Sequence, residues 1–195
     1  AFNGHRPAIE DHDQNNKFDG TADAIIDALR DYGTKSQKEG IDFADRWWHF
    51  DGALFRRLAI HLVTISERSA DDKINWLVEH TSLYESNYHH ETYHLLKATT
   101  AEASPSVKEH LLECAFAKSP KADLDSNKFE RHRTYNLLTW LTQCDTTWEQ
   151  ARIARDDLQA AHPGFAPRQH PDFSVWMESG IIGGRVPMPP EEFIN

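Results

Sequence analysis

Apolar residues recur every three or four positions through most of this chain, and that spacing is the strongest constraint on its fold. Residues 53–68 are the clearest example, because their large aliphatic side chains form one continuous seam at helical spacing. The seam consists of Leu54, Leu58, Leu62 and Ile65. No segment shows a convincing alternation of the kind typical of a β-strand. We therefore predict an all-α chain of antiparallel helix pairs, each burying its apolar stripe against the next pair in a stacked array.

Capping residues indicate where the predicted helices begin. Side-chain oxygens that can accept a hydrogen bond from the first helical turn precede four of the apolar patterns. They belong to Asp51, Ser69, Ser104 and Asp145. Gly33 is expected to fray or end the first helix, since glycine is common just past a helix C-terminus. The pattern predicts about seven or eight helices joined by short loops.

Composition divides the chain into three parts. Residues 1–20 are polar and have no period, so we expect a flexible lead-in. Residues 21–161 carry the helical pattern and form the predicted array. Residues 162–195 form a tail rich in Pro and Gly, with room for one short helix.

Three apolar residues of the tail are the predicted interaction residues. Phe173, Trp176 and Met177 stand at i, i+3 and i+4. We expect them to dock near Trp148 and Leu158 on the last long helix and to close the end of the array, as terminal segments of stacked arrays do. The alternative is an exposed contact for another chain, because aromatic residues and Met are enriched at such contacts.

The HETYH segment is the chain's only enzyme-like motif, with His90, Glu91 and His94 at its defining positions. On a helix, the two histidines project to one side and can share a zinc ion, while the glutamate acts as general base toward a metal-bound water. Glu113 is a candidate third ligand, and the arrangement resembles that of the gluzincin metallopeptidases. Those enzymes place a sheet before the motif helix, whereas residues 1–83 contain no strand-like run.

Helix geometry favours a structural role for the same segment. One stripe of the predicted helix is suited to the core: Tyr84, Tyr88, Thr92, Leu95, Leu96 and Thr99. His90 and His94 fall nearly opposite this stripe. They share their face with Asn87 and Lys97, so we expect that face to be solvated. The sequence thus favours a chain without a catalytic residue and without a cofactor. The alternative is a zinc site at these residues.

Charge and cysteine content limit the classes of partner. The 195 residues carry a formal net charge of −10, which argues against a nucleic-acid partner. No apolar run approaches the length of a membrane span. Two cysteines are too few for a disulfide framework, so we expect reduced thiols and a cytoplasmic protein.

Four segments carry a resemblance to a known class of proteins: LFRRLAIHLV, HHETYHLLKA, RHRTYNLLTWL and HPDFSVWMESG. They look like the helical region toward the C-terminal side of large prokaryotic proteins that carry a STAND-type NTPase or a sirtuin-like effector and are implicated in antiphage defence. The resemblance implies a HEAT-like scaffold or sensor, with catalysis in other domains. We therefore expect a non-catalytic module that binds a protein partner or a neighbouring domain of the same chain. A zinc-dependent metallohydrolase is the alternative.

Overall fold

The computed structural model describes residues 6–15, 20–117 and 124–173, and this part of the chain is all-α, as predicted, with no strand. A single 3-10 turn, η1 (Ser86–Tyr88), precedes α5. The helices are α1 (Thr21–Lys38), α2 (Ala44–Trp48), α3 (Ala53–Ile65), α4 (Ala70–His80), α5 (His89–Thr99), α6 (Pro105–Phe116), α7 (Leu124–Cys144) and α8 (Glu149–Ala161). Within these ranges, no helix has the length and apolar character needed to cross a bilayer.

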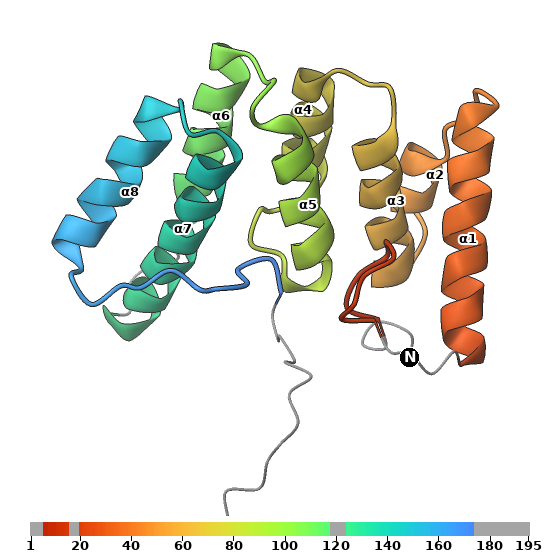
Figure 1. The fold of residues 1–195 in the computed structure, drawn as a ribbon, viewed down its shortest axis with the longest axis horizontal. Helices are drawn as coiled ribbons and strands as arrows, with labels where there is room; N and C mark the ends of the chain where they lie inside the picture. Colours follow the sequence, from red (N-terminus) through yellow and green to blue (C-terminus); the bar gives the residue numbers. More distant parts are fainter. Residues whose placement is uncertain (1–5, 16–19, 118–123, 174–195) are drawn as a thin grey trace, which may run out of the picture.

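The helices stand side by side in a row that runs from α1 at one end to α8 at the other (Figure 1). Helices α3, α5 and α7 contact one another in succession. Helices α4 and α6 contact each other, and α4 packs against α5 while α6 packs against α7. This arrangement gives two layers of helices. Since α3 also contacts α1 and α2, it is the most enclosed helix of its half of the molecule.

Helix α3 is buried on almost every side, which explains its nearly continuous apolar sequence. Leu58 and Leu62 of the predicted seam have no exposed surface, and neither do Ile60 and Val63 outside it. Ile65 ends the helix and is 42 % exposed, so the seam was wrong at that position. A single stripe underestimates the core here, because neighbouring helices cover α3 from several directions.

Two of the predicted helix starts are confirmed by their caps. Ser69 Oγ accepts from the Asp72 amide at 3.1 Å, and Ser104 Oγ accepts from the Val107 amide at 3.5 Å. The prediction for Asp145 was wrong, since α8 begins four residues later. The Asp145 carboxylate instead accepts from the Lys108 ammonium at 2.6 Å, which ties the start of the α7–α8 loop to α6.

Two glycines have structural roles that the sequence did not predict. Gly33 lies inside α1 rather than at its end, because the helix packs there at very short range. A Cβ at this position would stand 2.8 Å from the Trp47 ring and 3.0 Å from Leu62. The cap of α3 is Gly52, with φ of 116°, in place of the predicted Asp51. That backbone conformation is one that side-chain-bearing residues rarely adopt.

Two segments without regular secondary structure pack against the helical array. The N-terminal segment (residues 6–15) is packed rather than loose, since Ala8 and Ile9 have no exposed surface. The C-terminal strap (residues 162–173) runs from the end of α8 across α7 to α5 (Figure 1). The rest of the predicted tail, including most of its short helix, lies outside the described residues.

Substitution of Leu58 tests this core assignment. We expect Leu58→Ala to lower the free energy of unfolding by about 2–5 kcal/mol, the cost of leaving a cavity at a fully buried leucine. Ile65→Ala, on the exposed end of the same helix, should cost less than about 1 kcal/mol. Equal losses in urea-induced unfolding would show that the two positions share one environment and would contradict the structure.

Candidate functional site

Glu91, the general base of the zinc alternative, is engaged in a buried ion pair. Its side chain is 4 % exposed, and both of its oxygens accept from Arg57 of α3, at 2.9 Å from Nε and 2.8 Å from Nη2. The Ile9 amide donates to the same carboxylate at 3.1 Å. Burial alone would raise the pKa of Glu91, but the Arg57 guanidinium outweighs burial and holds that pKa below its usual value. Glu91 is therefore an ionised structural acceptor.

The Arg57 guanidinium also holds the backbone of the N-terminal segment. It donates to the Arg6 carbonyl at 2.8 Å and to the Pro7 carbonyl at 2.9 Å. One ion pair thus joins α3, α5 and the N-terminal segment. Arg6 adds a second tie, since its guanidinium lies 2.6 Å from Asp27 of α1.

The two motif histidines meet carboxylates that lie far away in the sequence. His90 Nε2 and His94 Nδ1 lie 3.3 Å and 2.9 Å from the two oxygens of Glu10. On its other side, His90 Nδ1 is 3.4 Å from Asp172 of the C-terminal strap, at ion-pair distance but without a hydrogen-bond alignment. Glu10, His90, His94 and Asp172 are called the His90 junction below.

The expectation of a solvated histidine face was wrong for His90, which is only 7 % exposed. The His94 side chain is 35 % exposed. Helical spacing placed both residues correctly, opposite the Leu95 and Leu96 stripe, which has no exposed surface. It failed to predict that the N-terminal segment and the C-terminal strap cover this face, because Glu10 and Asp172 lie some eighty positions from His90 in the sequence.

Charge in the His90 junction is set by the balance of burial and carboxylates. Burial lowers the pKa of His90, but Asp172, Glu10 and Glu91 more than compensate and raise it to about 9. Burial raises the pKa of Glu10, and the hydrogen bonds and charges of His90 and His94 bring it well below its usual value. At neutral pH, His90 is therefore a buried cation held between two carboxylates.

Phe173 lies at the same junction and not where the sequence suggested. Its ring is 3 % exposed and stacks on His90, with centroids 4.2 Å apart, and it also contacts the His12 ring at 4.9 Å. The prediction that Phe173 docks on α8, near Trp148 and Leu158, was therefore wrong, because the strap carries it past α7 to α5. Trp176 and Met177 lie outside the described residues.

The proposed third zinc ligand is not brought to the histidines. Glu113 lies on α6 with its side chain 73 % exposed, and its neighbour is His110 at 3.6 Å. Among residues 6–15, 20–117 and 124–173, no three His, Cys, Asp or Glu side chains are grouped as metal ligands. With Glu91 committed to Arg57, the residues do not match the roles that the zinc alternative assigns to them.

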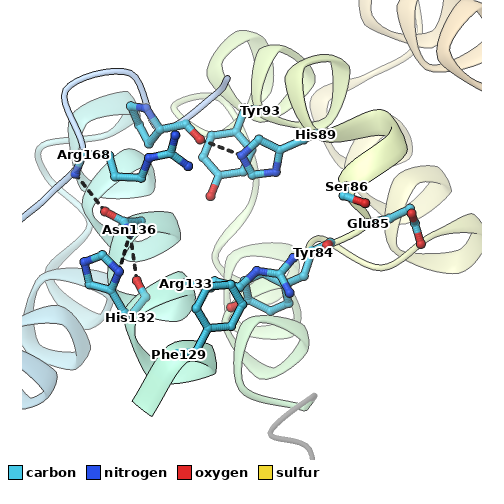
Figure 2. Close-up of a pocket in the computed structure, with 11 residues that line it drawn as sticks. Tyr84, Glu85, Ser86, His89, Tyr93, Phe129, His132, Arg133, Asn136 and Arg168 are labelled. Atoms are coloured by element: carbon cyan, nitrogen blue, oxygen red, sulfur yellow. Dashed lines mark hydrogen bonds between the residues drawn. The ribbon is translucent and has the colours of Figure 1, made fainter. Parts of the chain in front are cut away.

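A cavity of about 460 Å³ opens on the other side of α5 (Figure 2). Its walls are η1 with the turn before it, α5, α7 and the C-terminal strap. Figure 2 shows Tyr93 of α5, with its hydroxyl toward the open space, next to Arg168 of the strap. Asn136 of α7 fixes the strap there, because its side-chain oxygen accepts from the Arg168 amide at 2.9 Å. His89 Nε2 completes the attachment at 2.6 Å from the Pro171 carbonyl.

Several residues of both sites were not predicted from the sequence, although one of them could have been. Arg57 had a usable signal, since a charged residue within an otherwise apolar and buried helix requires a buried partner. Glu10 and Asp172 had none, because nothing in the sequence indicates which helix their segments contact. Arg133 and Arg168 of the cavity also had no signal, because only the path of the strap brings them to the same cavity.

Comparisons with known proteins add no relative. No protein-family model matches this chain, and neither the curated proteins nor the solved structures contain a match to it.

Neutralising Glu91 tests its structural role. Glu91→Gln should lower the free energy of unfolding by about 3–5 kcal/mol, because the Arg57 charge then remains buried without its partner. Glu113→Gln is the matched control and should change stability by no more than about 0.5 kcal/mol, since Glu113 is exposed. A Glu91→Gln protein as stable as the wild type would contradict the buried ion pair.

The pKa of His90 predicts a specific dependence of stability on pH. Because the pKa is about 9 in the folded chain and about 6.5 when unfolded, the junction stabilises fully below about pH 6.5. That contribution is lost as the pH rises through about 9. We expect wild-type unfolding free energy to fall by roughly 1–3 kcal/mol between about pH 6 and pH 9.5. His90→Gln should lack this fall, and parallel profiles for the two proteins would argue against a charged His90.

Proposed function

We propose that this chain is a non-catalytic, HEAT-like helical scaffold or sensor that binds a protein partner or a neighbouring domain of the same chain. The observation that carries the proposal is a partly exposed apolar stripe on α1, at one end of the row of helices. Helical arrays act through their exposed faces and ends, where a further layer or a partner covers apolar surface.

The end stripe consists of Ile25, Leu29 and Tyr32 of α1, at i, i+4 and i+7. Ile25 is 46 % exposed and Tyr32 is 57 % exposed, while Leu29 is half-buried. Tyr32 lies on Phe43, with ring centroids 5.5 Å apart, so the stripe continues onto the segment before α2. Aromatic and large aliphatic side chains of this kind favour a protein contact over a purely solvated face.

The HETYH motif supports the same proposal, because its Glu91 carboxylate is committed to Arg57 and to the Ile9 amide. A base that activates water needs an oxygen directed at that water. The sequence resemblance extends the proposal to a cytoplasmic module of a larger bacterial protein, in antiphage defence. The zinc hydrolase is the second candidate, supported only by the motif spacing.

Site-specific crosslinking tests the end stripe. A photo-crosslinking amino acid at Tyr32, in cells that express the natural full-length protein, should give one defined adduct with a partner or a neighbouring domain. The control position is Asp31, which is exposed and faces about 100° away around the helix. Ile25→Lys should then weaken binding of the purified adduct partner by about tenfold or more without lowering the melting temperature.

Two outcomes would contradict the proposal. Identical adducts from positions 31 and 32 would show that the stripe is not an interface. Stoichiometric zinc in protein purified without chelator, with a lower melting temperature after its removal, would favour the hydrolase.

A further inference from the structure

Two arginines line the cavity between α5, α7 and the C-terminal strap, on a chain whose net charge is −10. Arg133 reaches it from α7 and Arg168 from the strap (Figure 2). Both guanidiniums are held in place. Arg133 pairs with Glu130 at 3.3 Å and donates to the Tyr84 carbonyl, and Arg168 donates to the Phe173 carbonyl at 2.9 Å. Guanidiniums fixed in this way form a preorganised site for an oxyanion.

One of the described lining residues is acidic, and its carboxylate has a partner of its own. Glu85 is the lining carboxylate, and it is engaged by Asn87, whose side-chain amide donates to it at 2.9 Å. It lies at the far side of the opening from Arg168 (Figure 2). An anion beside Arg168 would therefore lie away from the Glu85 carboxylate.

Two uncharged hydrogen-bonding side chains of α5 line the cavity beside the arginines. Burial, with the charges of Arg133 and Arg168, lowers the pKa of His89, so its ring is neutral at physiological pH. Burial raises the pKa of Tyr93 above its usual range, so its hydroxyl keeps its proton and can donate toward the cavity. A ligand oxygen placed there meets a phenolic donor as well as the guanidiniums.

Aromatic surface completes the cavity. The Arg133 guanidinium lies over the Tyr84 ring at 5.1 Å and near the Phe129 ring at 5.8 Å. Phe129 stands at the cavity wall with 63 % of its surface exposed, the highest value among the exposed large apolar side chains of the described residues. A planar group in the cavity would cover this ring, which gives the site an apolar wall beside its charged one.

We propose that this cavity binds a small organic anion, with a phosphate or carboxylate group between Arg133 and Arg168 and a planar ring against Phe129. A volume of about 460 Å³ lies in the range of small-molecule sites. The site is separate from the end stripe of α1 and does not depend on the protein contact proposed there. Because the strap supplies one arginine, ligand binding also fixes the strap against α7.

Calorimetric titration of the whole chain with three probes tests the proposal. The probes are adenosine monophosphate, benzoate and, as the uncharged comparison, adenosine. At least one of the two anions should bind with a Kd below about 1 mM, and adenosine at least about tenfold more weakly than adenosine monophosphate if the phosphate is the anchor. Comparing the affinities of the two anions thus shows whether the site prefers a phosphate or a carboxylate group.

Three variants locate the binding. Arg168→Gln and Phe129→Ala should each weaken binding by about tenfold or more, whereas Arg152→Gln, on the exposed side of α8, should leave it unchanged. If Arg168→Gln lowers the melting temperature, the result for Phe129→Ala decides, because Phe129 is exposed and its removal spares the fold. Absence of binding by both anions below about 1 mM, or wild-type affinity in Phe129→Ala, would overturn the proposal.

Discussion

The buried ion pair between Arg57 and Glu91 is the interaction on which the rest of the structure depends. Removing two charges from water is costly, and the loss is offset only when every remaining donor and acceptor finds a partner. Here the partners are the Ile9 amide and the carbonyls of Arg6 and Pro7. The pair therefore stabilises the contact between α3 and α5 only when the N-terminal segment is docked. In this way the N-terminal segment, whose sequence has no helical periodicity, becomes part of the core.

Helix α5 presents its two faces to two different sites. His90 and His94 face Glu10 and Asp172 at the His90 junction, and His89 and Tyr93, one residue earlier in each turn, face the cavity. The C-terminal strap touches both, since Pro171 binds His89 and Asp172 lies beside His90. A ligand that holds the strap in the cavity thus also favours the His90 junction, which gives the proposed sensor a physical route from one face of α5 to the other.

The sequence predicted the features that depend on neighbouring residues. Helical spacing gave the all-α class, and side-chain oxygens placed the caps at Ser69 and Ser104. Prediction from the sequence failed where segments that are separated in the chain pack together. Gly33 does not end α1, because Trp47 packs against it, and His90 is not solvated, because Glu10 and Asp172 cover it. Such contacts leave no periodic pattern in either partner, so a single sequence cannot indicate them.

Amide hydrogen exchange at Ile9 tests the central claim most directly, because this amide donates to Glu91 and belongs to a segment with no secondary structure of its own. The structure predicts that Ile9 exchanges more than about 100-fold slower than an unstructured amide, alongside the buried amides of α3. Exchange near the unstructured rate, while α3 stays protected, would show that the N-terminal segment is not docked and would contradict a structural role for Glu91.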